Sequence, residues 1–523
     1  MTLVSPGVSV TIIDESFYVP ASATTVPLFF IATRADKKQP DGVSDAPGCK
    51  ESGVVRTITS LNQSVQTYGV PHFRTDSSGA GLHGDARNEY GLFAVNQALT
   101  ILSRAYVVRA DIDLSDSDIV TFSIATPSFS GAGNGSLRNL SVNQASAVNE
   151  AWTLTAISPT TFTVSGFTSG DQGTASVGVP YNNGIVSFMI QQGVTPFSIG
   201  DAFTFNITST VQSNPLGAND AAKRLSIVTA LQAEINSNQD VRSEYYEYNL
   251  ILCPGYHEVI DELLNLNQSI NEEAFVIADT PCNKNPEDTA IWSLTVERKR
   301  SQNVAYYYPL GLASNLNGVN VVCAASGIAL KQIAYSDSVS EVWFPPAGFR
   351  RGVVTGVEDM GYVSGTLGTA TKFISTPLNQ GQRDILYEHM KNVNIIPFFP
   401  GRGIVVYGQK TSYSLSSALD RINVMRMLIK IKRDIRKASL AYLFELNDRI
   451  TRESIKQMID SYLNDIMLRR GLYDYVVMCD ETNNTGTRID RNELWVDIAL
   501  KPAKAVEFIY IPIRVVSTNA DIG

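Results

Sequence analysis

The sequence predicts an α/β protein with an all-β insertion and an extended strand at each end. From residue 220 onward, helix-like and strand-like segments alternate, which favours a largely parallel sheet with helices on both faces. Between residues 115 and 219, Thr, Ser, Gly and Asn dominate and short strand-like runs follow one another. The opening SPGVSVTIID alternates Val8, Val10 and Ile12 with polar residues, as in a strand with one buried face.

Size and charge narrow the class of protein. The 523 residues suggest several domains, and 44% hydrophobic with 18% charged residues is typical of an ordered globular chain. The net charge of −9 disfavours direct binding to nucleic acid or to anionic membranes. The start lacks a secretory signal and no run of about 18 apolar residues occurs, so we expect cytosolic synthesis and no membrane insertion. The five scattered cysteines form no C-x-x-C pair and are expected to be reduced thiols.

The first part of the body is predicted as strands over 24–36 and 104–112 with a helix over 89–102. The insertion that follows contains a single basic residue, Arg138, and is expected to project from the body. The continued body is predicted as helices over 221–235, 258–267 and 287–300 and as strands over 248–255, 272–281, 303–309 and 319–325.

The end of the chain combines two helices with short strands. Helices are predicted over 421–438 and 451–471, the second with an apolar face and with Gly471 as its stop signal. YDYVVMCD (473–480) and ELWVDIALKP (493–502) then indicate two strands. AVEFIYIPIRVVS (505–517) is a further strand, and its Pro512 restricts it to an edge or a bulge.

Signals for an enzyme are few. His257, Asp279 and Ser326 each follow a predicted strand, so a serine hydrolase triad at the strand ends is one hypothesis. Ala324 and Ile328 stand where a G-x-S-x-G elbow has glycines, which argues against it. GIVVYGQKT (403–411) resembles a phosphate-binding loop but has an extra residue before Lys410 and a strand-like interior. With four histidines and no H-E-x-x-H, we expect no catalytic residues, no cofactor and no metal.

The helix over 421–438 carries a basic stripe. Arg426, Lys430, Arg433 and Lys437 recur at spacings of four, three and four, opposite an apolar stripe. Two interpretations are open: a solvated helix face, or a surface that docks an acidic partner.

Several segments together resemble the tail sheath proteins of contractile-tailed bacteriophages. They are the opening MTLVSPGVSV, PPAGFRRG (345–352), SALDRINVMRMLIKIKRDI (417–435), and the long block from GLYDYVVMCD to EFIYIPIRV (471–515). The resemblance covers both ends and most of the α/β body, but not the β-rich insertion.

The resemblance implies a fold and a division into domains. The fold class is a subtilisin-like α/β body with an all-β insertion domain, a C-terminal α+β domain and extended terminal strands exchanged between subunits. The expected boundaries are an N-terminal exchange arm (1–20), the first part of the body (21–114), an outer β-rich insertion (115–219), the continued body (220–400), a tube-facing α+β domain (401–503) and a C-terminal exchange arm (504–523).

The resemblance also implies the residues of a strand-exchange site. A two-stranded sheet is marginal alone, and end strands from neighbouring subunits would complete it. The exchanged strands are expected to carry Val8, Val10, Ile12, Phe508, Tyr510, Ile511, Ile513 and Val515, and the acceptor sheet Tyr475, Val477, Leu494, Val496, Ile498 and Leu500. The basic stripe, Arg426, Lys430, Arg433 and Lys437, is expected to dock the tail tube.

The implied function is structural. Members of the family form stacked hexameric rings around a tail tube and contract to drive it through the host cell envelope. The expected partners are other copies of the chain, the tube protein, and baseplate and tail terminator proteins, with assembly in the host cytoplasm and a final place in the virion tail. Two alternatives are a cryptic serine hydrolase on the α/β body and a tube or fibre subunit.

Overall fold

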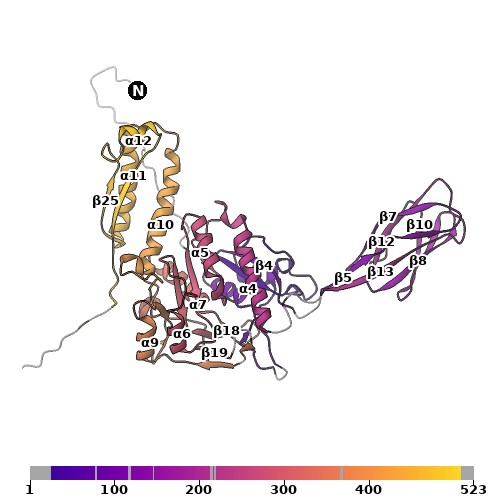
Figure 1. The fold of residues 1–523 in the computed structure, drawn as a ribbon, viewed down its shortest axis with the longest axis horizontal. Helices are drawn as coiled ribbons and strands as arrows, with labels where there is room; N and C mark the ends of the chain where they lie inside the picture. Colours follow the sequence, from indigo (N-terminus) through magenta and orange to yellow (C-terminus); the bar gives the residue numbers. More distant parts are fainter. Residues whose placement is uncertain are drawn as a thin grey trace, which may run out of the picture. The chain divides into compact units, whose positions relative to one another are not determined.

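The chain separates into two compact units. The computed structural model describes residues 25–76, 79–115, 119–144, 146–212, 216, 220–365, 369–370, 372–507 and 510. One unit, the body, is built from the chain before residue 115 and after residue 215, and the other, the β-rich unit, spans Ser115–Pro215. Figure 1 shows the elements of both.

A seven-stranded sheet forms the centre of the body. Every neighbouring pair in it is parallel except the pair between the first two strands, β2 and β4. In spatial order the strands are β2 (Arg56–Ile58), β4 (Ala105–Asp113), β1 (Pro27–Thr33), β14 (Leu250–Leu252), β15 (Phe275–Asp279), β16 (Val304–Tyr308) and β22 (Val393–Ile395). The largely parallel α/β sheet that the alternating pattern predicts is therefore confirmed.

Helices cover both faces of this sheet. Leu28 and Phe30 of β1 pack in one hydrophobic cluster with α4 (Asp220–Ser237) and α5 (Ile260–Ser269). Phe29 and Ile31 point to the opposite cluster, which contains α3 (Tyr90–Ala98) and α7 (Ala325–Val339). Successive strand residues point to opposite faces, so a strand covered on both sides is apolar at every position.

Two expectations for the body are wrong in detail. The strand predicted over 319–325 forms as β18 (Asn320–Cys323), but in a separate antiparallel sheet with β17 (Leu310–Ser314), β19 (Asp359–Ser364) and β21 (Lys372–Ser375). The helix predicted over 287–300 ends early, as α6 (Pro286–Trp292). Past its end the chain continues in tight turns, in which Leu294 and Thr295 donate their N–H groups to the carbonyl oxygens of Ile291 and Trp292 at 3.0 and 2.9 Å.

Short elements complete the body. The helices are α1 (Pro47–Lys50), α2 (Leu61–Tyr68), α8 (Gly348–Arg351) and α9 (Gln380–Tyr387), with single turns η1 (Asp240–Arg242), η2 (His257–Val259) and η3 (Ala418–Asp420). Two strand pairs are β3 (Gly84–Asp85) with β20 (Thr369–Ala370) and β23 (Phe398–Phe399) with β24 (Gly403–Ile404).

The β-rich unit has its own core. One sheet contains β5 (Ile119–Ile124), β6 (Ser128–Ser130), β8 (Glu150–Ser158), β9 (Thr161–Gly166), β10 (Gly170–Ser176) and β13 (Ala202–Gln212), and a second contains β7 (Gly135–Val142), β11 (Pro180–Asn182) and β12 (Val186–Gln192). Residues from both sheets form one cluster centred on Trp152, which stacks on Phe205 at 6.2 Å between ring centroids. All members of that cluster belong to this segment.

The C-terminal part of the body is built on two long helices and a small sheet. Helix α10 (Ile422–Ser439) leads through η4 (Leu440–Tyr442) to α11 (Arg449–Leu468), followed by β25 (Leu472–Met478), α12 (Gly486–Asp490) and β26 (Asp497–Pro502). Ile422, Met425 and Ile429 of α10 pack in the cluster that contains α3 and α7. Met427 and Ile431 pack instead with α11 and the small sheet in a separate cluster, the C-terminal core. Helix α10 therefore belongs to two cores.

Residues 115–215 expressed alone should fold. Their cluster needs no side chain from the body, so we expect a β-type circular dichroism spectrum and a cooperative melt. Trp152→Ala in the same fragment should lower the free energy of unfolding by about 3–5 kcal/mol, because it empties the centre of the core. A fragment that shows no cooperative transition would mean that the unit depends on the body.

Candidate strand-exchange site

The predicted acceptor sheet exists as an antiparallel pair. Tyr475 of β25 lies opposite Leu500 of β26, and Val477 lies opposite Ile498. One face of the pair packs on α10 and α11: Val477 is buried in the C-terminal core, and the other three are partly buried against it. The hydroxyl of Tyr475 also donates to the carbonyl oxygen of Asp460 in α11 at 3.0 Å. The helices therefore fix the sheet in place from one side.

The second acceptor strand is shorter than expected. The alternation in ELWVDIALKP predicts a strand from residue 493, but β26 begins at Asp497. Leu494 and Val496 still pack against the C-terminal core, so their apolar character reflects burial in the preceding segment. Alternation of apolar and polar residues alone does not distinguish a strand from an irregular segment that is buried on one side.

An asparagine network, which the sequence analysis missed, holds the long connection between the two strands. Asn484 is buried, accepts from the backbone N–H of Trp495 at 2.7 Å, and donates to the carbonyl oxygen of Trp495 at 2.9 Å. Asn483 donates to the carbonyl oxygen of Met478 at 2.8 Å and to the Asp497 carboxylate at 3.0 Å. The Asn-Asn pair in ETNNTG was the available signal, since Asn side chains often bridge backbone groups in loops.

Both outer edges of the sheet and its outer face are open within the described residues. β25 and β26 pair only with each other there. On the outer face, Val476 is 54% exposed and Met478 is 41% exposed. An unpaired edge presents backbone N–H and C=O groups to any further strand, and a sheet of two strands gains stability when strands are added. The arrangement is suited to accepting strands.

The predicted exchange strands fall almost entirely outside the described residues. This holds for Val8, Val10 and Ile12 at one end and for Phe508, Ile511, Ile513 and Val515 at the other. Tyr510 is described and is 87% exposed.

The segment after β26 leaves the sheet. Ala503 donates its N–H to the carbonyl oxygen of Gly471 at 3.0 Å, at the end of the sheet where β26 finishes. Glu507 is then bound by Arg421, with 2.7 Å between Nε and Oε1, at the start of α10. Figure 1 shows this segment running on past the end of the small sheet. The chain therefore does not turn back at once to pair with its own β26.

The structure corrects the role expected for the basic stripe. Arg426 and Arg433 are buried, at 4% and 6% exposure, instead of lying on an open face. Arg426 forms a bidentate ion pair with the buried Asp337 of α7, one of whose bonds, from Nη1 to Oδ1, is 3.0 Å long. Arg433 donates to the carbonyl oxygen of Tyr248 at 2.9 Å. These two cations join α10 to α7 and to the segment before β14, and they are not free for a tube.

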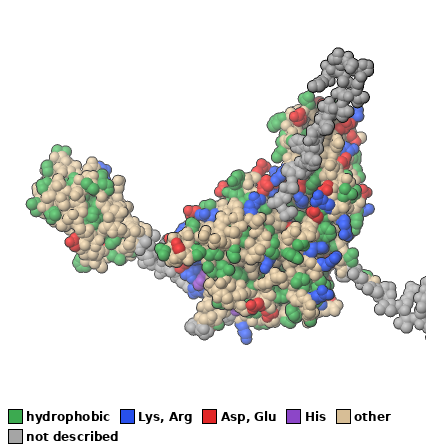
Figure 2. Space-filling model, turned by 180° about the vertical axis from the view of Figure 1, so that it is seen from behind, with side chains coloured by type: hydrophobic (Ala, Val, Ile, Leu, Met, Phe, Trp, Pro, Cys, Tyr) green, Lys and Arg blue, Asp and Glu red, His purple; other side chains and the backbone are tan. Residues whose placement is uncertain are grey.

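The lysines of the stripe are paired in the same way. Lys430 pairs with Asp434 at 2.8 Å, and Lys437 pairs with Glu247 of the body at 2.6 Å. Arg436 adds an ion pair to Glu273 at 2.8 Å. The acidic partner that the stripe indicates is thus found within the same chain. On the face of the body seen in Figure 2, basic and acidic side chains are mixed.

The structure does not arrange Ser326, Asp279 and His257 as a catalytic triad. Ser326 donates its hydroxyl and its backbone N–H to Asp279, both at 2.7 Å, and Gly255 donates its N–H to the same carboxylate at 2.8 Å. Asp279 therefore caps the start of α7, although burial raises the pKa of its carboxyl group. The Nδ1 atom of His257 instead lies 3.3 Å from the Glu258 carboxylate, and its ring packs edge-on against Trp292. The serine is bound to the aspartate directly, and the histidine is engaged elsewhere.

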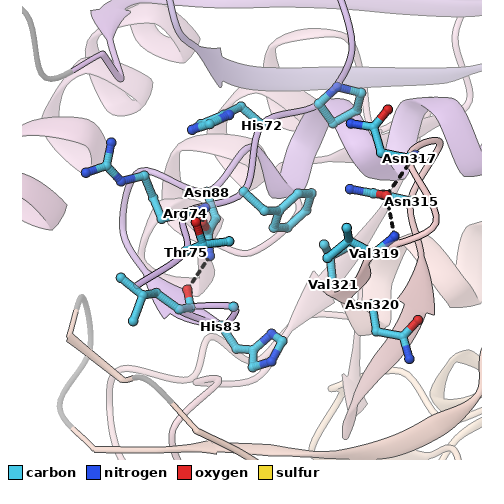
Figure 3. Close-up of a pocket in the computed structure, with 14 residues that line it drawn as sticks. His72, Arg74, Thr75, His83, Asn88, Asn315, Asn317, Val319, Asn320 and Val321 are labelled. Carbon is cyan, nitrogen blue, oxygen red and sulfur yellow. Dashed lines mark hydrogen bonds between the residues drawn. The ribbon is translucent and has the colours of Figure 1, made fainter. Parts of the chain in front are cut away.

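A small cleft of about 140 Å³ lies between the segment 71–88 and the loop 315–321 (Figure 3). His72, Arg74 and His83 line one side, and Asn315, Asn317 and Asn320 line the other. Burial lowers the pKa of both histidines. The polar groups among the described lining residues are imidazole, guanidinium, hydroxyl and amide groups.

The lysine of the segment that resembles a phosphate-binding loop contacts a tyrosine. Lys410 of the loop-like GIVVYGQKT donates to the carbonyl oxygen of Tyr387 at 2.5 Å and lies 4.0 Å from its ring centroid. The strand in that segment is limited to Gly403–Ile404. Among the residues that the structure describes, no cluster of three or more His, Cys, Asp or Glu could hold a metal, and no helix is long and apolar enough to span a membrane.

Arg426→Gln should strongly destabilise the body. It leaves Asp337 buried without its cation, which typically lowers the free energy of unfolding by about 3–5 kcal/mol. Arg449→Gln is the matched control, since Arg449 is 80% exposed and pairs with a neighbouring glutamate on its own helix. We expect a change there within about 0.5 kcal/mol in urea unfolding. Equal effects would argue against a structural role for the buried pair.

His257 makes stability fall in mild acid. Burial lowers its pKa to about 4, so the folded chain keeps it neutral while the unfolded chain takes up a proton below about pH 6.5. Stability is therefore lost as pH falls from about 6.5 to 4, by about 3 kcal/mol from this group. His257→Gln should flatten urea unfolding midpoints over that range relative to wild type, whereas His389→Gln, at an exposed position, should not.

The C-terminal part of the chain matches a known family. Residues 414–516 match the model for the phage tail sheath C-terminal domain. Over 190 residues, the chain is 43% identical to the tail sheath protein of Vibrio phage KVP40, which covers 36% of this chain and 26% of the relative. Identity to the tail sheath protein of Enterobacteria phage T4 is 37% over 188 residues, with the same shares of 36% and 26%. The chain thus spans about a quarter of the length of these curated relatives.

Solved structures match along nearly the full length. The sheath complex of the extracellular contractile injection system PVC, in its contracted state, aligns with a TM-score of 0.56 and 15% identity, covering 98% of each chain. The helical sheath of the anti-feeding prophage, also contracted, aligns with a TM-score of 0.55 and 17% identity, covering 98% of this chain and 99% of that one. Residues 414–516 are thus similar to the phage tail sheath C-terminal domain, and the chain has the fold seen in these contractile sheath structures.

Proposed function

We propose that this chain is a structural subunit of a contractile tail sheath. It would polymerise as stacked hexameric rings around a tail tube and contract to drive the tube through the host cell envelope. The body would be the subtilisin-like α/β domain of that family, used as a scaffold and not as an enzyme. The curated relatives are named tail sheath proteins, which supports the proposal.

The observation that carries the proposal is the incomplete sheet of β25 and β26. Its inner face is held by α10 and α11, while its edges lack further strands within the described residues. The chain that follows β26 runs away from the sheet, to Arg421. These contacts support the proposal that the segment beyond residue 507 pairs with another subunit.

We propose that strands from two neighbours complete this sheet. Val8, Val10 and Ile12 of one neighbour and Phe508, Tyr510, Ile511, Ile513 and Val515 of another would pair at its edges by strand addition. Such pairing keeps subunits tethered through backbone hydrogen bonds, which do not depend on how the bodies pack. Bodies that repack while the tethers hold would allow the sheath to switch between two packed states.

The remaining partners follow from the same proposal. The tube, the baseplate and a tail terminator would contact the assembled sheath, and assembly would take place in the host cytoplasm before the sheath becomes part of the virion. One solved relative belongs to the baseplate of the anti-feeding prophage, with a TM-score of 0.54 and 16% identity, which supports the baseplate contact. The tube contact would have to use residues other than the paired basic stripe.

Deleting residues 1–16 should abolish polymerisation and leave the monomer folded. The deleted strand is proposed to pair with a neighbouring subunit, so its loss should leave the hydrophobic cores formed by the described residues of the body intact. Electron microscopy and sedimentation of the purified protein measure the polymers, and circular dichroism measures the fold. A second variant replaces Val8, Val10 and Ile12 with threonine, which keeps the length and removes the apolar face. Tubes that persist after the deletion would contradict the exchange.

A further inference from the structure

The roots of both terminal segments are attached near the start of α10. Thr25, the first described residue, donates its hydroxyl to Asp337, which is the ion-pair partner of Arg426. Glu507, near the other end, is bound by Arg421 just before α10 begins. Arg421 and Arg426 are separated by about one and a half helical turns, so two ends far apart in sequence are attached to the same part of α10.

The carboxylate of Glu507 is held by several contacts. Arg421 binds both carboxylate oxygens, Nε to Oε1 at 2.7 Å and Nη2 to Oε2 at 3.1 Å. Gln409 donates to Oε1 at 3.0 Å, and Arg421 is also paired with Asp420 at 2.8 Å. The side chains of Arg421 and Glu507 are 27% and 16% exposed. A bidentate, largely covered pair is stronger than an ordinary surface ion pair.

The ion pair that binds Thr25 is more deeply buried than the ion pair that binds Glu507. The side chains of Arg426 and Asp337 are 3% and 2% exposed. The next residue, Val26, donates its N–H to Asn249 at 2.9 Å and is buried among the residues that pack with α4 and α5. The chain is therefore fixed at Thr25 before β1 enters the sheet.

We propose that the start of α10 is a two-point anchor for the terminal segments. Arg421 and Gln409 hold the C-terminal segment through the carboxylate of Glu507, and the Asp337–Arg426 pair holds the N-terminal segment through the hydroxyl of Thr25. Helix α10 packs in two hydrophobic cores. A pulling force on either terminal segment would therefore pass through its anchor to the body before the residues next to the anchor unfold. This inference rests on the proposed exchange of end strands between subunits.

The test uses the full chain with Glu507→Gln and Thr25→Val, which keep side-chain shape and remove one anchor each. Glu453→Gln is the matched control, because it breaks an exposed ion pair to Arg449 on α11 and touches neither segment. In the unassembled protein, the backbone amides of Ala503 and Lys504, which donate to the carbonyl oxygen of Gly471 and the hydroxyl of Tyr473, should exchange hydrogen about tenfold faster in Glu507→Gln than in wild type or control. The amide of Val26, which donates to Asn249, should exchange faster in Thr25→Val.

Polymers of the two anchor variants should form as in wild type but break into shorter pieces under the same shear, as seen by electron microscopy. Unchanged exchange in both variants would overturn the anchor, and so would faster exchange with unchanged resistance to shear. A wild-type chain that forms no polymer would instead contradict the proposed function, while hydrogen exchange would still decide whether the anchor exists.

Discussion

The buried ion pair between Arg426 and Asp337 is the constraint on which the C-terminal half of the molecule depends. A guanidinium and a carboxylate removed from water are tolerable only together, since either alone is a costly buried charge. Their pairing fixes the rotation of α10 against α7. With that rotation set, Met427 and Ile431 face the C-terminal core, and α11 and the small sheet follow. Lys437 and Arg433 of the basic stripe then meet the carboxylate of Glu247 and the carbonyl oxygen of Tyr248.

The inner face of the small sheet is packed on helices, whereas its edges have no further strands within the described residues. Its inner side chains and the asparagine network fix its register, so an added strand would meet a preformed edge. Binding to a preformed edge avoids the entropy of ordering the acceptor, and backbone hydrogen bonds provide most of the contact. The rigid helices beneath are thus as important to strand addition as the edge itself.

The sequence predicted most elements and few of their tertiary partners. Residues such as Phe29 and Phe30 reveal a strand buried on both faces, because a short run that is apolar at every position is typical of strands covered on both sides. The sequence revealed the basic stripe but not the acidic partner of Arg426, because Asp337 lies 89 residues earlier in the chain. Likewise β18 was predicted as a strand, whereas its membership of an antiparallel sheet depends on β17 and β19. All the strand-exchange residues, those before residue 25 and those from residue 508 on, remain predictions.

The β-rich unit is inserted between β4 and α4, and both of its connections begin within the body's own packing. Leu114 before it and Leu216 after it are buried in the same hydrophobic cluster, at 1% and 2% exposure. The two residues that flank the insertion are therefore packed in the body's own cluster, which contains no residue of the insert's core. Evolution can lengthen, replace or remove the inserted module at this point while the central sheet keeps its strand order. The same junction is a natural site at which to graft a foreign domain.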